Sequence, residues 1–211
     1  MLFADRADAG RRLALEVEPL VDGDAVVLAL PRGGVPVAAE VAQHLGVELD
    51  IIGVRKIGAP GRPELGVGAV AEGGGLVLDE RTLGQLGIGA EDVAATIERE
   101  RLEVARRVQG YRGGRPLPDL AGRTVILVDD GLATGVTARA AVRAVRAQDA
   151  GRVLLAVPVS SRQGRDELAS EVDEFVCVEA PHSFHAVGQW YRDFRQTTDE
   201  EVLAALERAA S

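Results

Sequence analysis

The stretch that decides the fold runs from Val125 to Thr137 and reads VILVDDGLATGVT. Its first four residues are apolar and mostly β-branched, which predicts a buried parallel strand. The two carboxylates and the Gly/Thr-rich turn that follow would lie at the carboxyl end of this strand, where open α/β sheets bind ligands. An Ala-rich run that extends to Gln148 predicts a helix after the turn.

The turn from Ala133 to Thr137 is a candidate phosphate site, because free backbone N–H groups and the positive end of the helix dipole would point there. Gly131 and Gly135 permit close backbone approach, and two Thr hydroxyls add donors. Asp129 and Asp130 have the wrong charge for a phosphate but can accept hydrogen bonds from hydroxyls. A sugar phosphate would satisfy both halves. The alternative is an ordinary strand–turn–helix unit with a solvated aspartate pair.

This block resembles the signature of the type I phosphoribosyltransferases: four apolar residues, two acids, three variable residues, then Thr-Gly-x-Thr. The resemblance implies that the acid pair holds the 2- and 3-hydroxyls of the ribose in phosphoribosyl pyrophosphate (PRPP), and that the turn holds its 5-phosphate. It also implies an α/β fold, a Rossmann-like parallel sheet flanked by helices with a small C-terminal hood. A P-loop is excluded because no Lys follows Gly135, and a dinucleotide fingerprint is excluded by the glycine spacing.

A second glycine-rich loop follows the strand expected at residues 25–30 and precedes a helix expected at residues 35–45. It contains Pro31, Arg32, Gly33 and Gly34. Backbone N–H groups and the guanidinium would form an anion cradle here. The resembling family uses this loop for pyrophosphate, often with a non-proline cis peptide, which here would be Pro31–Arg32. Taken alone, the loop could be a plain strand-to-helix turn.

The cations Arg55 and Lys56 follow a strand expected at residues 49–54, and Lys56 is the only lysine of the chain. Adjacent cations repel each other, and a bound polyanion would remove that cost, so we expect both to contact pyrophosphate; a solvated basic pair is the alternative. Residues 57–68 are rich in Gly and Pro and are expected to form a long mobile lid. Arg62 and Glu64 are its charged residues.

The rest of the chain predicts further strands at residues 67–71, 76–78, 152–159 and 174–178, and helices at 9–20, 81–89, 90–109, 162–169 and 198–210. Aromatic residues gather between Phe184 and Tyr191. They could form a hood that stacks on a heterocyclic acceptor, or they could pack the tail against the core. His182 and His185 lie near Cys177, but their irregular spacing and the lack of a second Cys argue against structural zinc.

Composition sets the remaining expectations. The 211 residues suffice for a single domain, with a core at about 20–178 and a hood and tail at about 179–211. A net charge of −9 argues against nucleic-acid binding. One cysteine, no signal-peptide pattern and no run near the roughly twenty apolar residues of a membrane span favour a cytoplasmic location without membrane contact. A homodimer is an expectation from the family only.

The resemblance therefore predicts transfer of the 5-phosphoribosyl group of PRPP to a nitrogenous acceptor, with Mg²⁺ bridging pyrophosphate and ribose hydroxyls near Asp129 and Asp130. Members that act on 6-oxopurines usually carry an acid where Ala133 stands and a hood lysine that this chain lacks, so the acceptor base stays unassigned. A non-catalytic PRPP- or nucleotide-binding regulator and a magnesium-dependent phosphate hydrolase are the alternatives. The predicted catalytic residues are Asp129, Asp130, Lys56 and Arg55, and the predicted substrate-binding residues are Arg32, Gly33, Gly34, Gly131, Ala133, Thr134, Gly135, Val136, Thr137 and Phe184.

Overall fold

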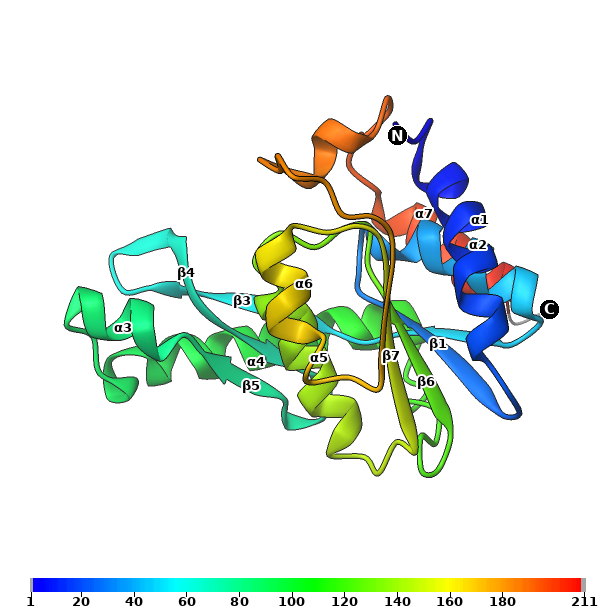
Figure 1. Cartoon of the computed structure of the whole chain (residues 1–211). Coiled ribbons are helices and arrows are strands. Elements are labelled where there is room, and N and C mark those ends of the chain that lie inside the picture. The colour runs from blue at the N-terminus through cyan, green and yellow to red at the C-terminus, as the bar shows by residue number, and fades with distance from the viewer. Residues whose placement is uncertain (1, 210–211) are drawn as a thin grey trace.

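The computed structural model describes residues 2–209 and divides their strands between a five-stranded parallel sheet and a three-stranded antiparallel sheet (Figure 1). The parallel sheet has the order β2-β1-β6-β7-β8. The order therefore reverses between β1 and β6, and open α/β sheets bind ligands at such a reversal, beyond the carboxyl ends of the strands. The parallel strands are β1 (Ala25–Ala29), β2 (Glu48–Ile51), β6 (Thr124–Val128), β7 (Arg152–Val159) and β8 (Glu174–Glu179).

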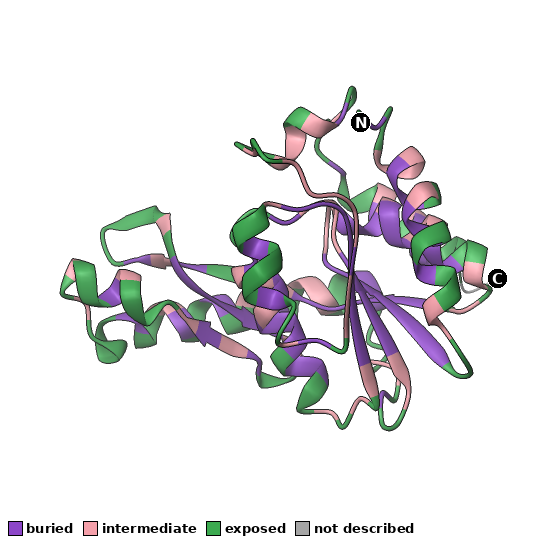
Figure 2. Cartoon of the chain, in the orientation of Figure 1, coloured by how far each residue is buried: buried purple, intermediate pink, exposed green. Residues whose placement is uncertain are grey.

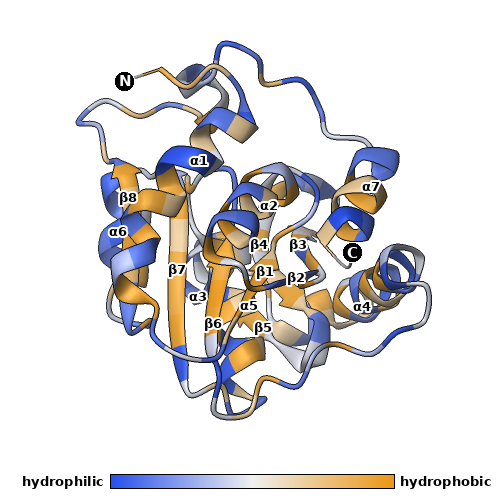
Figure 3. Cartoon of the chain, turned by 90° about the vertical axis from the view of Figure 1, so that its right-hand side faces the viewer, coloured by the Kyte–Doolittle hydropathy of each residue, from blue (hydrophilic) through white to orange (hydrophobic). Residues whose placement is uncertain are grey.

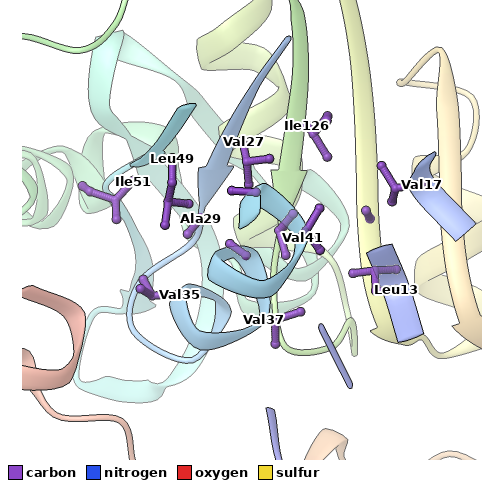
Figure 4. Packing of buried hydrophobic residues seen from close by; sticks show 14 of the residues in the cluster. Leu13, Val17, Val27, Ala29, Val35, Val37, Val41, Leu49, Ile51 and Ile126 are labelled. Carbon is purple, nitrogen blue, oxygen red and sulfur yellow. The ribbon is translucent and has the colours of Figure 1, made fainter. Parts of the chain in front are cut away.

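Helices cover both faces of the parallel sheet, and its three central strands, β1, β6 and β7, are buried along almost their whole length (Figure 2). Val27 and Ile126 face α1 (Arg6–Val17) and α2 (Gly34–Leu45), as the packing in Figure 4 shows. Their neighbours in sequence face the opposite layer. Burial on both faces explains why these strands read as continuous apolar runs. The first layer also includes α7 (Asp199–Ala209), and the second contains α5 (Val136–Arg146) and α6 (Arg162–Leu168).

Residues 54–112 form a second unit, called the arm below, which extends to the left of the core in Figure 1. Its antiparallel strands pack on two helices around Ile57 and Val70, whose side chains are fully buried. Hydrophilic and hydrophobic residues alternate along the longer of the two helices, α4 (Ala90–Arg112) (Figure 3). The arm consists of β3 (Val54–Ala59), β4 (Arg62–Ala71), the short helix η2 (Glu72–Gly74), β5 (Leu76–Leu78), α3 (Glu80–Leu86) and α4 (Ala90–Arg112).

A buried ion cluster joins the arm to the core. The Arg112 side chain, at the end of α4, is 1% exposed, and its Nε lies 2.9 Å from Asp50 Oδ1 on β2. The same guanidinium also pairs with Glu72. A buried charge is tolerated only when it is paired and hydrogen-bonded, and here both carboxylates meet that condition.

The prediction of a mobile loop at residues 57–68 is wrong, because this segment forms most of a β3–β4 hairpin in which Ala59 pairs with Arg62. Two glycines are required by the geometry of this hairpin. Gly61 adopts a left-handed conformation in the turn (φ 72°), and a methyl group at Gly58 would lie 2.5 Å from Pro63 O. Gly and Pro here permit a tight, bulged hairpin. Arg55 and Lys56 therefore lie within β3, beyond the end of β2.

The other predicted elements are confirmed to within a few residues, apart from the helix end at Ala210, which lies outside the described residues. The predicted capping box of the last helix forms: Thr198 N–H donates to Glu201, and Glu201 N–H donates to Thr198. The first helix begins three residues earlier than expected, at Arg6, because Asp5 accepts a hydrogen bond from Asp8 N–H at 2.8 Å and caps it. Within residues 2–209, no helix is long and apolar enough to cross a membrane.

Residues 181–197, called the hood below, pair with the N-terminal segment. Phe3 forms a bridge with Tyr191, and Arg192 N–H donates to Phe3 O at 2.9 Å. Phe184 is partly buried and packs on a cluster that contains Phe3 and Tyr191. The structure thus gives the aromatic residues of this region a packing role between the two ends of the chain.

Candidate functional site

The acid pair lies directly beyond β6 and is held by its own backbone and by the hood. Asp130 N–H donates to Asp129 Oδ1 at 2.8 Å, and the Tyr191 hydroxyl donates to Asp130 O at 2.6 Å. Burial raises the pKa of both carboxyl groups, and the charge of Asp130 raises the pKa of Asp129 further. Two adjacent carboxylates in a desolvated place favour a ligand that donates hydrogen bonds or brings positive charge.

The loop after β1 meets the acid pair, as the sequence predicted. The Pro31–Arg32 peptide bond is cis. A methyl group at Gly33 would overlap the Asp130 carboxylate, and one at Gly34 would lie 2.6 Å from Val128 O. Only glycines allow this close approach of the two loops. The Arg32 guanidinium, however, lies 3.7 Å from Asp199 at the start of α7, where the Tyr111 hydroxyl also donates to Asp199.

The two adjacent cations point to different sides of β3, because successive strand residues face opposite ways. Arg55 Nε lies 2.6 Å from Glu100 Oε2 on α4, so its charge is already paired. Lys56 lines a cleft of about 760 Å³ together with Thr134 and Val136, and its charge acts on Asp129. The structure places Lys56 in a cleft beside the predicted phosphate turn and pairs Arg55 with a helix of the arm.

The predicted phosphate turn leads into α5, which starts at Val136 after Gly135 in a left-handed conformation (φ 71°). No side chain among residues 2–209 caps the first N–H groups of α5, so they can bind an anion. Ser161 stabilises the turn, since its hydroxyl donates a hydrogen bond to Ala133 O at 2.5 Å. Gly131 packs on the hood, where a methyl group would come within 2.9 Å of a Val187 methyl.

Arg6 is a site residue that the sequence prediction missed. Its Nε donates to Asp130 Oδ2 at 2.8 Å, and its Nη2 lies 2.7 Å from the same oxygen. Its Nη1 donates to Arg195 O at 2.7 Å, and its guanidinium carbon lies 4.0 Å from the centre of the Phe194 ring. The signal in the sequence was Asp5 with Asp8 three residues later, which marks a helix start just before Arg6.

Two further candidates, Phe184 and His182, have other partners. Phe184 packs in the aromatic cluster of the hood, and its predicted contact with an acceptor stays a prediction. His182 Nε2 lies 2.8 Å from Arg162 Nη2 at the start of α6.

A parallel sheet whose strand order reverses between β1 and β6, with an acid pair and two glycine-containing loops at that reversal, defines the type I phosphoribosyltransferase fold. The chain belongs to the family described as the phosphoribosyl transferase domain, whose model matches residues 6–195.

Two curated proteins from Mycobacterium tuberculosis, strains CDC 1551 and H37Rv, carry the provisional name phosphoribosyl transferase and are each 46% identical over 208 residues. The match covers 99% of this chain and 47% of theirs, so the chain spans about half the length of the curated relatives it matches.

The crystal structure of TT1426 from Thermus thermophilus is 44% identical with a TM-score of 0.84, and the match covers 100% of both chains. A Neisseria gonorrhoeae protein with bound ppGpp shares the fold at 14% identity and a TM-score of 0.54, covering 99% of this chain and 98% of its own.

Proposed function

We propose that this protein transfers the 5-phosphoribosyl group of PRPP to a ring nitrogen of an acceptor base and releases pyrophosphate. The observation that carries the proposal is the contact between Gly33 and the Asp130 carboxylate, which puts the β1 loop and the acid pair against each other at the strand-order reversal. Sugar hydroxyls and a phosphate leaving group require such a meeting of carboxylates with anion-binding backbone.

The proposed binding roles follow from charge. Asp129 and Asp130 accept hydrogen bonds from the ribose hydroxyls. The N–H groups from Ala133 to Thr137, at the start of α5, bind the 5-phosphate. The β1 loop and Lys56 bind pyrophosphate; Arg55, which is paired with Glu100, is not part of the proposal. Arg32 can also bind pyrophosphate, because its pair with Asp199 is long and solvent-exposed, and such pairs contribute little to stability.

The proposed reaction is a substitution at the ribosyl carbon. The lone pair of the acceptor nitrogen forms the new C–N bond while the C–O bond to pyrophosphate breaks, and its electron pair leaves on the pyrophosphate oxygen. The proton of the acceptor nitrogen passes to pyrophosphate or water. The chain contributes by aligning the reactants and by stabilising charge on the sugar and the leaving group.

Magnesium fits these residues as an ion that arrives with the substrate. Residues 2–209 contain no group of three or more His, Cys, Asp or Glu side chains that could hold a metal by themselves. Asp129 nevertheless accepts from a backbone N–H and, among the same residues, has no hydrogen-bonded cation. Mg²⁺ is commonly held by one or two carboxylates together with substrate phosphates. When bound, the ion would neutralise phosphate charge as the leaving group departs.

The acceptor class is restricted by what the chain lacks. Ala133 stands where relatives acting on 6-oxopurines carry an acid, and its carbonyl is already bonded to Ser161. The only lysine, Lys56, lies in the cleft on β3 and outside the hood. We therefore propose an acceptor other than hypoxanthine or guanine. A cytoplasmic location and a homodimer stay predictions.

Titration calorimetry with PRPP and Mg²⁺, followed by a screen of nucleobases for pyrophosphate release, tests the proposal. We expect saturable PRPP binding, loss of most of it in Asp130→Asn with an unchanged circular dichroism spectrum, and base-dependent pyrophosphate release. Binding without turnover on any base would support the regulatory alternative. Phosphate release without an acceptor would support a hydrolase, and no PRPP binding at all would reject the proposal.

A further inference from the structure

Arg6 touches the acid pair from an unexpected part of the chain, the first residue of α1. Its side chain is 11% exposed, and a guanidinium buried to this degree needs every N–H partnered. We propose that Arg6 is the positioning residue that holds Asp130 in the orientation in which it accepts a ribose hydroxyl. This inference rests on the proposed function, because it assigns the arginine to ribose recognition in that same site.

The atoms used by the pair support this assignment. Both contacts of Arg6 reach Asp130 Oδ2, at 2.8 Å from Nε and 2.7 Å from Nη2. The hydrogen bonds of the Asp130 carboxylate within residues 2–209 go to this oxygen, so Oδ1 can accept from a ligand. Gly33 packs against the same carboxylate. Asp130 is thus fixed on one side by two guanidinium nitrogens of Arg6, called the fork below, and on the other by the backbone of Gly33.

The guanidinium is itself held rigidly by the hood. Its face lies on the Phe194 ring at 4.0 Å, and Nη1 donates to Arg195 O at 2.7 Å. A planar group with several fixed N–H directions can use one edge for Asp130 and another for a carbonyl, whereas an ammonium is a single point charge on a flexible stem. The shape of Arg6, beyond its charge, is what fixes Asp130.

Pairing between the chain ends places this fork. Phe3 lies in a bridge with Tyr191, and Asp193 N–H donates to Ala4 O at 3.0 Å, two residues before Arg6. Tyr191 also donates to Asp130 O. The N-terminal segment and the hood therefore act together on one carboxylate.

The test measures binding of three ligands to Arg6→Lys by calorimetry in Mg²⁺: PRPP, ribose 5-phosphate and inorganic pyrophosphate. Lysine keeps the charge beside Asp130 but loses the fork. We expect affinity for PRPP and ribose 5-phosphate to fall about 10- to 100-fold, as expected for lost hydrogen bonds between charged groups, and affinity for pyrophosphate to stay the same. The matched control is Arg112→Lys, another buried arginine, whose partners Asp50 and Glu72 belong to the joint between arm and core; it should keep all three affinities.

The outcomes separate this inference from the proposed function. Failure of the wild-type protein to bind PRPP would reject the proposed function. Wild-type binding with equal ribose 5-phosphate affinity in Arg6→Lys, or a parallel loss of pyrophosphate affinity, would reject the role of Arg6. If Arg6→Lys does not fold, Phe194→Leu takes its place, since it removes the ring on which the guanidinium stacks and keeps an apolar side chain next to Tyr191. It should weaken the same two ligands by a smaller factor, and unchanged affinities there would also reject the role.

Discussion

Two regions of this molecule bury the same set of charges, two carboxylates and one arginine, and they use it differently. In the joint between arm and core, Arg112 pairs with both Asp50 and Glu72. At the end of β6, Arg6 pairs with Asp130 only, and the adjacent Asp129 accepts from a backbone N–H. In the joint both carboxylates contact the arginine, which closes the network, whereas at the acid pair only Asp130 contacts Arg6.

The difference teaches how to tell a structural cluster from a binding site. In a closed buried network, the desolvation of the charged groups on folding is offset by their mutual pairing, and the pairing fixes two elements together. A cluster in which one buried carboxylate lacks a cationic partner lowers stability until a ligand binds, as expected of a site built for binding. Burial and the charge of Asp130 raise the pKa of Asp129, the carboxyl group without an arginine partner among residues 2–209.

The largest effect should come from opening the closed network. Arg112→Met leaves Asp50 and Glu72 buried without their cation, and breaking such a pair costs about 3–5 kcal/mol. Urea denaturation should show this loss, with the arm unfolding at lower urea than the core. The exposed Arg106→Met is the control and should change the free energy of unfolding little. An Arg112→Met protein as stable as wild type would show that the joint does not hold the two units together.

A matched pair of substitutions should next give effects of opposite sign. Asp50→Asn removes a charge that Arg112 needs and should lower the free energy of unfolding by about 1–3 kcal/mol. Asp129→Asn removes a buried charge that has no arginine partner in the described part of the chain and should raise the free energy of unfolding by about 1 kcal/mol while weakening PRPP binding. Chemical denaturation at pH 7 in the absence of Mg²⁺ and PRPP measures both. The same sign for the two variants would remove the distinction between joint and site.

The closed joint and the open site were not equally readable from the sequence. The β6 strand, the acid pair and the β1 loop were predicted because each is a local pattern and parallel strands bring their carboxyl ends to one edge. The Arg6–Asp130 contact joins residues 124 positions apart, and Arg112–Asp50 joins residues 62 apart. No local pattern encodes such partners. The hairpin after Arg55 was missed because glycine and proline serve tight bulged strands as well as loops.

The adjacent cations Lys56 and Arg55 on β3 provide the third comparison, because Lys56 lines the cleft beside the phosphate turn and Arg55 pairs with Glu100 on α4. Lys56→Ala should weaken binding of inorganic pyrophosphate with Mg²⁺ by about tenfold, the loss of one charge-assisted hydrogen bond. Arg55→Ala should keep that affinity and lower thermal stability instead, since Glu100 keeps, within the described residues, only its longer pair with Arg99. Calorimetry and thermal melts on both variants measure this. Equal losses of pyrophosphate affinity in the two variants would show that Arg55 also binds pyrophosphate.

The smallest effect on stability should come from the exposed cluster of Glu103 with Arg106 and Arg107, which has two cations for one carboxylate. Hydrogen bonds from Arg106 and Arg107 lower the pKa of Glu103 to about 2. Since its folded pKa lies below the unfolded value of about 4.3, its contribution to stability is present above that pH and is lost as the pH falls toward 2. Glu103→Gln should therefore reduce stability slightly at pH 7 and not at pH 2.

Thermal melts of wild type and Glu103→Gln from pH 7 to pH 2, at low and at high salt, measure this difference. Solvent and salt screen the pair, so the difference should shrink in about 1 M salt, whereas the loss in Arg112→Met should persist because its partners are buried. A salt-independent effect of Glu103→Gln would mean that pairing alone, without burial, fixes the energy of a cluster. The contrast between the joint and the acid pair would then have to be explained by geometry and not by desolvation.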